Sequence, residues 1–480
     1  MAFVGSSLKD HARARPMERA LSCDRRFWTW ADLFEDVEAL SGHLVSRISY
    51  GGRVALCLTD PADLLIAFLA VIRRGGLAMV FDPAWPPARR SWVERETVPD
   101  LVLDALPLAE FRSWTPPSSL PTGAPDETAL FYAGFTSGST GDPKGYCRTH
   151  RSWLKSFELS RAEFAIGPHN RIVIPGSLVH SLHLYGAVHG LHAGAGVVLC
   201  PRFSPKALAE QLREADGTVF YATPTQIHYV AEELKRSGPA PTVGLVLASG
   251  AKWRAEDRRA MAAVFPRARL VEFYGASEMS FITVSTPEDP VPDRSVGRAA
   301  SGVSIRIGEP GNLPVAPGTI GPIWVKSGLL FDRYICGGGE EVCWKDGWLT
   351  VGDHGFLDDN GFLYLAGREK RMIVTSGLNI YPEEVEQVLA GHPSILAVAV
   401  FGLPDPVRGC RLVAAVTPEP GERIDESELR RLCLSELGRS RTPRSFHVVS
   451  DWPLTPGGKT DLQKLEQGLL QLLSSAEAAE

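Results

Sequence analysis

Helix-like and strand-like segments alternate near the start of the chain, and this alternation constrains the fold more than any other feature. Residues 30–46 carry apolar side chains at helical spacing, and residues 53–58 form a short apolar run typical of a strand. A second helix is predicted over residues 62–72 and a second strand over residues 77–81. Strands that alternate with helices form parallel sheets whose faces the helices cover. The sequence therefore predicts an α/β fold here.

The same rhythm returns further along the chain and then gives way to a different pattern. Helix and strand patterns recur over residues 171–273, whereas residues 295–364 hold short alternating runs divided by glycine and proline, typical of antiparallel strands. Residues 369–480 again mix strand and helix patterns, which is enough chain for a small α+β domain. We therefore predict a large N-terminal domain, residues 1–368, followed by a small C-terminal domain.

Charge and cysteine content exclude several classes of protein. The chain has 50 basic and 56 acidic side chains, and its net charge of −6 offers no footprint for nucleic acid or an anionic membrane. Its longest apolar stretch near the start, residues 64–72, is far shorter than the roughly 20 residues of a membrane span. The eight cysteines include no C-x-x-C pair, which favours reduced thiols. We expect a cytoplasmic enzyme with no nucleic-acid partner and no membrane span.

The most informative motif is the stretch F-T-S-G-S-T-G-D-P-K-G at residues 135–145. Glycines let backbone N–H groups turn toward an anion, hydroxyl side chains add donors, and a lysine adds positive charge. The pattern suits a phosphate cradle, although its spacing is not that of a P-loop. The alternative is a glycine- and serine-rich surface loop, and composition alone favours neither interpretation.

This stretch also resembles the signature loop of the acyl- and aryl-adenylate-forming superfamily, the AMP-binding enzymes. Further motifs of that family follow in order at residues 74–83, 272–278, 348–353, 367–370, 376–386 and 453–459. They read RGGLAMVFDP, EFYGASE, WLTVGD, GREK, SGLNIYPEEVE and PLTPGGK. Departures from the family pattern occur at Ser277, at Val351, and at residues 297–298, 321–322 and 460–462, and they leave the thiol acceptor open. The ordered set covers nearly the whole chain and resembles a stand-alone acyl-CoA synthetase.

The resemblance implies both a fold and a reaction. The fold would have a large domain of stacked α/β subdomains with a small β-barrel-like part, and a small mobile C-terminal α+β domain. In the reaction a carboxylic acid attacks the α-phosphate of ATP, pyrophosphate leaves, and a thiol then attacks the acyl-adenylate. The implied cofactors are ATP, Mg²⁺ and coenzyme A. The protein would position the reactants and stabilise charge, with its domains alternating between the two half-reactions.

Residue roles follow by position from the same resemblance. Glu278 would hold Mg²⁺ and take part in catalysis, Lys459 would bridge the acid and the α-phosphate, Lys370 would be the hinge, and Gly377 would border the thiol channel. The expected ATP-binding residues are Thr136, Ser137, Gly138, Ser139, Thr140, Gly141, Lys144, Gly250, Ala251, Tyr274, Gly275, Ser277, Asp353 and Arg368. Each of these residues also has an ordinary structural interpretation, as a surface lysine, a core tyrosine or a turn residue. The ordered set makes the functional interpretation the prediction.

Four histidines stand in one short segment, at positions 180, 183, 189 and 192. The resemblance implies that His180 or His183 closes the acyl pocket, and His180 is favoured. A metal site is the alternative, because two histidines one helical turn apart can share a metal ion. No carboxylate or cysteine completes such a ligand set nearby, which argues against it.

The substrate class follows from a charge that this segment lacks. Amino-acid-activating relatives place an aspartate there for the substrate ammonium group, whereas residues 179–186 read VHSLHLYG. A buried ammonium group without a counter-charge would cost several kcal/mol. The neighbouring pocket candidates, Tyr221 and Ala248, are also uncharged. We therefore predict an uncharged hydrophobic acid, whether aryl, alicyclic or medium-chain acyl.

Cys147 has no evident paired base, so no nucleophilic role is predicted for it.

Three functions remain open at this point. The first is an acyl-CoA ligase, the second an enzyme that loads an acyl or aryl acid onto a separate carrier protein, and the third a nucleotide-binding protein without catalysis. The third would require the loss of a chemical residue, yet Lys144, Glu278, Asp353 and Lys459 are all present. The sequence contains no attached carrier motif of the L-G-G-x-S type. We therefore favour the acyl-CoA ligase.

Overall fold

The computed structural model describes residues 2–106, 125–137, 143–249, 255–289, 291–292, 294–338, 342–375, 378–405, 409–454 and 460–477. The chain divides into two compact units. Unit 1 comprises Met1–Ile305, Val325–Leu349 and Gly361–Leu363, and unit 2 comprises Arg306–Trp324, Thr350–Asn360 and Tyr364–Glu480. Unit 2 therefore contains the predicted C-terminal domain together with short segments that precede it. The domain boundary after residue 368 stays a prediction.

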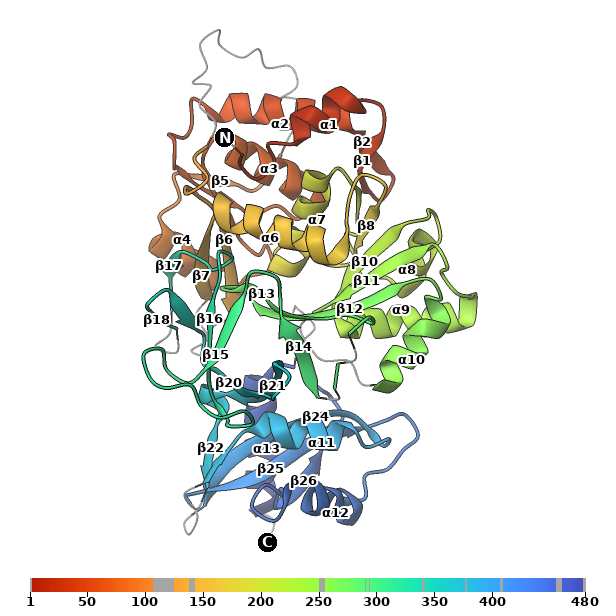
Figure 1. Ribbon diagram of the computed structural model, residues 1–480, viewed down its shortest axis with the longest axis vertical. Helices are drawn as coiled ribbons and strands as arrows, with labels where there is room; N and C mark the ends of the chain where they lie inside the picture. Colours follow the sequence, from red (N-terminus) through yellow and green to blue (C-terminus); the bar gives the residue numbers. More distant parts are fainter. Residues whose placement is uncertain are drawn as a thin grey trace. The chain divides into compact units, whose positions relative to one another are not determined.

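One sheet of unit 1 has the strand order β17-β7-β6-β4-β3-β5. Its strands are β3 (Arg53–Leu56), β4 (Leu77–Val80), β5 (Leu101–Leu103), β6 (Leu130–Ser137), β7 (Pro143–Thr149) and β17 (Arg333–Cys336). Strands β5, β3, β4 and β6 pair in parallel, whereas β7 pairs antiparallel with β6 and β17. The first helices of unit 1 are α1 (Leu8–Ala14), α2 (Trp30–Leu44), α3 (Pro61–Arg73) and α4 (Pro87–Thr97) (Figure 1).

Helix α3 illustrates how the sequence specifies this layer. The Asp60 carboxylate accepts hydrogen bonds from the backbone N–H groups of Ala62 and Asp63, and Pro61 occupies the first turn. These are the usual signals for a helix start. Nearly every residue from Pro61 to Ile72 is buried, because the helix is apolar on all sides. The helix predicted over residues 62–72 is confirmed.

A second, larger sheet includes, within unit 1, the strand order β14-β13-β12-β11-β10-β8-β9-β1-β2. These strands are β1 (Arg19–Cys23), β2 (Arg26–Thr29), β8 (Arg171–Ile174), β9 (Gly196–Leu199), β10 (Thr218–Ala222), β11 (Val243–Ala248), β12 (Arg269–Ala276), β13 (Ser280–Ser285) and β14 (Ser295–Ala299). Its helices are α6 (His150–Phe164), α7 (Ser181–Ala193), α8 (Pro205–Leu212), α9 (Pro224–Ser237) and α10 (Ala255–Val264).

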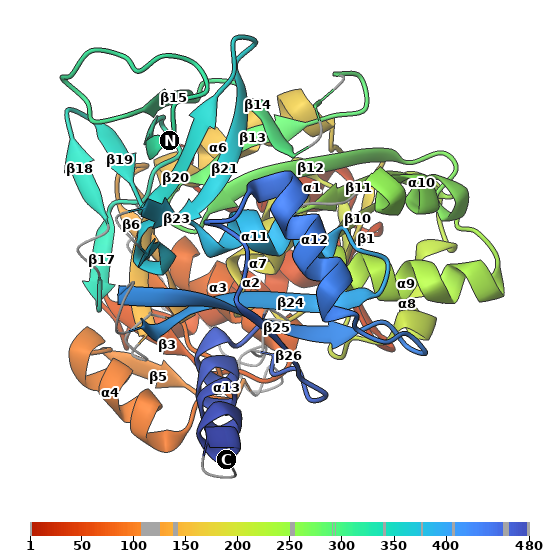
Figure 2. The ribbon, with the colours of Figure 1, turned by 90° about the horizontal axis from the view of Figure 1, so that it is seen from below.

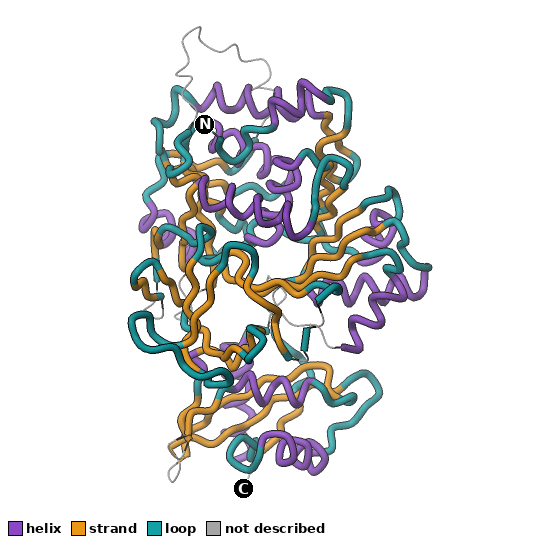
Figure 3. The backbone as a smooth tube through the Cα atoms, in the orientation of Figure 1, coloured by secondary structure: helices purple, strands orange, loops and turns teal. Residues whose placement is uncertain are grey.

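Helices cover both faces of this second sheet (Figure 3). Successive side chains of a strand point to opposite faces. On β10, Phe220 and Ala222 join the core cluster that includes residues of α8, α9 and α10. The intervening Tyr221 lies against Gly186 of α7 instead. The α/β layering predicted from the sequence is therefore confirmed.

Short strands fill the stretch between residues 304 and 368. They are β15 (Ser304–Ile307), β16 (Gly321–Lys326), β18 (Cys343–Lys345), β19 (Trp348–Thr350), β20 (Asp353–Leu357) and β21 (Phe362–Arg368). Strand β16 pairs antiparallel with β19 and with β20, as predicted. A barrel requires the two end strands of a sheet to pair. The described strands form sheets with open ends, so the expected barrel-like closure is not found among them.

Unit 2 is built on the sheet β24-β25-β26. Its elements are η1 (Glu369–Arg371), β22 (Ile373–Thr375), β23 (Leu378–Ile380), α11 (Pro382–Ala390), β24 (Ile395–Asp405), β25 (Gly409–Pro418), α12 (Glu426–Leu437), β26 (Ser445–Val448) and α13 (Leu462–Glu477). On one face Val400 packs with Val385 and Leu429 of α11 and α12, and on the other Phe401 packs with Leu465 of α13 (Figure 2). This confirms the predicted α+β architecture.

Candidate active site

The two ends of the predicted phosphate stretch lie on β6 and β7, which pair as the antiparallel arms of a hairpin. In its antiparallel register Thr136 lies opposite Lys144. The hairpin therefore places the half-buried Lys144 side chain across from Thr136 at the base of the glycine-rich segment. Strand β6 ends at Ser137, whose side chain is not described, and Gly138, Ser139, Thr140 and Gly141 lie outside the described residues.

A tight turn between β12 and β13 carries the next predicted site residues. Strand β12 ends at Ala276 and β13 begins at Ser280, so Ser277 and Glu278 lie in the turn. A Cβ atom at Gly275 would collide with the backbone carbonyl oxygen of Ser280, so glycine is required at this close approach. Tyr274 precedes it on β12 and is half-buried. Gly250 and Ala251, predicted to border the same nucleotide pocket, lie outside the described residues.

The segment around β17 holds Glu278 in place. The backbone N–H of Phe331 donates to the backbone carbonyl of Glu278 at 2.7 Å. The Tyr334 hydroxyl donates to Oε1 of the Glu278 carboxylate at 2.8 Å. Within the described ranges no hydrogen-bond donor meets the second carboxylate oxygen, Oε2. Mg²⁺ prefers carboxylate oxygens, so the arrangement fits the ion that the sequence predicts.

The start of α7 lies against the same turn. The hydroxyl oxygens of Ser181 and Ser277 share a hydrogen bond of 3.2 Å. His180 precedes the helix as its N-cap residue, is half-buried, and makes no side-chain capping bond. The segment predicted to border the acid is therefore joined directly to the residue predicted to contact the α-phosphate.

His183 is more enclosed than His180. It is 3% exposed, and its Nδ1 lies 3.3 Å from the Ser177 carbonyl oxygen. Its Nε2 lies 3.3 Å from the side-chain oxygen of Gln226, a residue of the α9 capping box. Burial lowers the pKa of His183 to about 4, so the ring is neutral near pH 7. His183 therefore presents a buried, uncharged side chain at the start of α7.

Tyr221 and Ala248 lie on neighbouring strands but on opposite faces of the sheet. Tyr221 is 1% exposed and packs against Gly186 of α7, on the same side as the histidine segment. Within the described part of the chain its hydroxyl has no hydrogen-bond partner, and burial raises its pKa well above the usual value. Ala248 instead joins the core cluster that includes residues of α8, α9 and α10. The structure thus brings Tyr221, but not Ala248, to the α7 face.

The remaining described candidates belong to unit 2. Asp353 begins β20 and is 6% exposed, and Arg368 donates from Nε to its Oδ1 at 3.0 Å. The two residues predicted at the ribose are therefore in direct contact. Lys370 lies in the exposed 3-10 turn η1. Gly377 and Lys459 lie outside the described residues.

Sequence reasoning missed Arg148, a residue of β7. It is 1% exposed, and its guanidinium donates to the Ser277 carbonyl at 3.0 Å and to the Ser280 hydroxyl at 2.7 Å. The available signal was the alternation along β7, which places Tyr146 and Arg148 on the same face as Lys144. An arginine at such an inward position needs buried hydrogen-bond acceptors.

Three alternatives from the sequence are decided by burial and geometry. Among the described residues no group of three or more histidine, cysteine or acidic side chains could hold a metal ion, so the histidine metal site is not supported. Cys147 is fully buried, and burial raises its pKa to about 12, which is unfavourable for a nucleophile. Within the described ranges no helix is long and apolar enough to cross a membrane.

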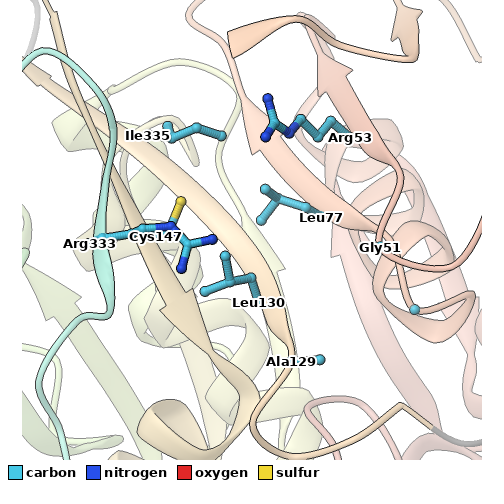
Figure 4. Close-up of a pocket in the computed structure, with 9 residues that line it drawn as sticks. Gly51, Arg53, Leu77, Ala129, Leu130, Cys147, Arg333 and Ile335 are labelled. Carbon is cyan, nitrogen blue, oxygen red and sulfur yellow. The ribbon is translucent and has the colours of Figure 1, made fainter.

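A cavity of about 260 Å³ opens elsewhere in unit 1 (Figure 4). Arg53 and Leu77 line it on one side, and Cys147, Ile335 and Arg333 on the other. None of the predicted site residues borders it. The cavity is therefore separate from the candidate active site.

Comparison with known proteins identifies the family of the chain. The family model described as AMP-binding enzyme matches residues 8–335, and the model of the AMP-binding enzyme C-terminal domain matches residues 384–459. An uncharacterized acyl-CoA ligase, YhfT of Bacillus subtilis, is 35% identical over 479 residues, covering 95% of this chain and 96% of that protein. The sulfoacetate-CoA ligase of Cupriavidus necator is 33% identical over 445 residues, covering 88% and 85%.

A solved structure shows the same fold. The o-succinylbenzoate CoA synthetase of Bacillus subtilis, in complex with its acyl-adenylate intermediate, superimposes with a TM-score of 0.83 at 24% identity, over 96% of this chain and 97% of that one. The family models match well over half of the chain and the Bacillus subtilis relative YhfT is 35% identical over 95% of it, so the chain belongs to the AMP-binding enzyme family.

Proposed function

We propose that this protein is an AMP-forming acyl-CoA ligase. The carboxylate attacks the α-phosphate of ATP to form an acyl-adenylate with release of pyrophosphate, and the acyl group is then transferred to the thiol of coenzyme A with release of AMP. The observation that carries the proposal is the turn at Ser277 and Glu278, hydrogen-bonded both to the segment around β17 and to the start of α7. That arrangement joins a carboxylate suited to Mg²⁺ with the segment expected to border the acid. The CoA ligase names of the relatives support the same reaction.

The residues of unit 1 bind and orient the triphosphate. Lys144 and Thr136 stand at the base of the phosphate hairpin, where a positive charge and a hydroxyl contact the β- and γ-phosphates. Ser277 donates its hydroxyl toward the α-phosphate, and Tyr274 stacks on the adenine. Glu278 would hold Mg²⁺, and the ion would supply positive charge to stabilise the pyrophosphate leaving group.

The residues of unit 2 contact the ribose and supply a second positively charged side chain, that of Lys459. Asp353 accepts hydrogen bonds from the ribose hydroxyls, and Arg368, which already contacts Asp353, steadies that carboxylate. Lys459 bridges the acid oxygen and the α-phosphate, where negative charge gathers in the transition state. The hinge at Lys370 then allows Gly377 to approach the thiol channel for the second half-reaction.

The acid is an uncharged hydrophobic one. The two pocket candidates on the α7 face that are fully buried, His183 and Tyr221, are neutral near pH 7, since burial lowers the pKa of the first and raises that of the second. A neutral, buried wall disfavours a second charge on the substrate, because an unpaired buried charge costs several kcal/mol. An aryl, alicyclic or medium-chain acid avoids that cost.

A panel of acids tests this substrate class. Pyrophosphate release is measured with benzoate-type, alicyclic and medium-chain acids, and with α-amino acids and sulfoacetate, the acid named for one relative. We expect kcat/KM to be highest for an uncharged hydrophobic acid. A clear preference for an α-amino acid or for sulfoacetate would contradict the substrate class.

The thiol acceptor is tested separately. Thioester formation is followed with coenzyme A and, in parallel, with a phosphopantetheinylated carrier protein. The proposal predicts an acyl-CoA product, whereas transfer to the carrier alone would favour the carrier-loading alternative. Nucleotide binding that does not depend on the acid, without any pyrophosphate release, would favour the alternative of a nucleotide-binding protein without catalysis.

A further inference from the structure

Arg148 is a buried cation that joins three segments of unit 1. Its Nε donates to the Ser152 hydroxyl of α6 at 3.2 Å, and its Nη1 donates to the Ser277 carbonyl at 3.0 Å. Its Nη2 donates to the Ser280 hydroxyl at 2.7 Å and also to the Leu329 carbonyl. Four of the five guanidinium hydrogens are therefore used.

This arrangement is costly for a side chain that only fills space. Arg148 is 1% exposed, and among the described residues no carboxylate forms an ion pair with it. Burial lowers its pKa to about 10, which reflects the loss of hydration. Taking a charged group out of water costs several kcal/mol. The cost points to a role beyond packing.

The contacts of Arg148 fall on the two segments that hold Glu278. One is the turn at Ser277 and Ser280, and the other is the segment from Leu329, which also supplies the Tyr334 hydroxyl to the Glu278 carboxylate. Arg148 therefore binds both segments from the side of β7. Because Lys144 lies on the same face of β7, the same strand connects the phosphate hairpin to the Glu278 turn.

We propose that Arg148 is a positioning residue for adenylation, fixing the turn so that Ser277 and Glu278 present their oxygens to the magnesium–ATP complex. The inference rests on the proposed function, since it takes Glu278 as the magnesium ligand. Arg148 does not touch the reacting atoms. Its effect passes through the Ser277 carbonyl and the adjoining Glu278.

The test measures nucleotide binding rather than turnover. Calorimetry gives the dissociation constant of ATP with excess Mg²⁺ and again with a chelator. The magnesium ratio is the constant with the chelator divided by the constant with Mg²⁺, and it reports how much Mg²⁺ strengthens binding. Arg148→Lys keeps the charge but loses the planar fork. We expect this variant to reduce the ratio about tenfold, as for the loss of one or two buried hydrogen bonds.

Arg171→Lys is the matched control. Arg171 is a partly buried arginine of unit 1, and it donates to Gln211 and Glu214, away from the Glu278 turn. This variant should leave the ratio unchanged even if it lowers thermal stability. Equal reductions in both variants would show a general loss of stability and would overturn the inference.

A double-mutant cycle with Glu278→Gln locates the effect. If Arg148 acts through Glu278, Arg148→Lys causes no further reduction of the ratio in the Glu278→Gln background. An unchanged ratio in Arg148→Lys alone, or the same reduction in both backgrounds, would overturn the inference. If Arg148→Lys does not fold, Ser280→Ala removes one of the Arg148 hydrogen bonds, together with a longer one from Ser156, and should reduce the ratio about threefold. No reduction in that variant would overturn the inference.

The outcomes separate this inference from the proposed function. Wild-type protein that releases pyrophosphate with an acid, while Arg148→Lys keeps the full magnesium ratio, overturns only the role of Arg148. Wild-type protein whose ATP binding gains nothing from Mg²⁺ overturns both.

Discussion

The hydroxyl of Tyr334 donates a 2.8 Å hydrogen bond to Oε1 of Glu278, so Oε2 is the oxygen that we expect to bind Mg²⁺ under the proposed function. Tyr334→Phe removes this donor while keeping the ring. We expect the Mg²⁺ concentration for half-maximal pyrophosphate release to rise about tenfold, since hydrogen bonds to charged groups are among the stronger ones. The exposed Tyr229 gives the control, because Tyr229→Phe should change nothing. An unaltered Mg²⁺ requirement in Tyr334→Phe would mean that the phenol does not orient the carboxylate.

Lys459 should matter for one half-reaction only. Lys459→Ala removes a positive charge from the transition state of adenylation, and such a loss typically lowers the rate ~10²–10³-fold. Thioester formation from supplied acyl-adenylate should be spared. Lys464→Ala is the control, because this exposed side chain contacts only Asp461 among the described residues, at 3.7 Å. Equal losses in both half-reactions would contradict the assigned role.

Two substitutions of Lys370 test whether the hinge depends on the backbone or on the side chain. Lys370 lies in the 3-10 turn η1, and Lys370→Pro fixes φ and removes a backbone donor. We predict near-normal adenylation but much slower thioester formation. Lys370→Ala, which keeps backbone freedom, should support both steps. Unchanged thioester formation in the proline variant would place the hinge elsewhere.

Several features of the fold could be predicted because they depend on local pattern. Helix α3 needed only its apolar run, its Asp60 cap and the glycines that follow it. Other features depend on distant pairing. The strands between residues 304 and 368 showed alternation, but whether they close into a barrel depends on end-to-end pairing that no local pattern reports.

The candidate site shows the same division between local motif and tertiary packing. Thr136 lies opposite Lys144, and Arg368 contacts Asp353, but the roles of these residues toward ATP stay predictions. Ala248 lies opposite Ala222 in the register of β10 and β11, so its side chain is on the other face from Tyr221, and its role in the acid pocket stays a prediction. Arg148 was missed because its partners come from three separate segments.

Buried neutral histidines should make stability depend on pH. His189 is 1% exposed, and burial lowers its pKa from 6.5 to about 3. The unfolded chain therefore binds a proton that the folded chain excludes between these values. The stability due to the neutral ring is fully present above pH 6.5 and is lost as the pH falls toward 3, by at most about 1.4 kcal/mol per pH unit.

His189→Leu tests this contribution. The Nδ1 atom of His189 has no hydrogen-bond partner among the described residues, so its loss should cost little near pH 7. Urea unfolding of wild type and variant at pH values from 7 to 5 should show a shallower decline for His189→Leu. Parallel declines would mean that other groups set the pH dependence.

Acid-dependent exchange of labelled pyrophosphate into ATP is the most direct test of adenylate formation. It reports the first half-reaction without any thiol, and it is measured for wild type and for Glu278→Gln with and without Mg²⁺. The account predicts exchange that requires both a hydrophobic carboxylic acid and Mg²⁺, and that falls at least ~10²-fold in Glu278→Gln. Exchange that is independent of the acid, or equally fast in Glu278→Gln, would contradict it.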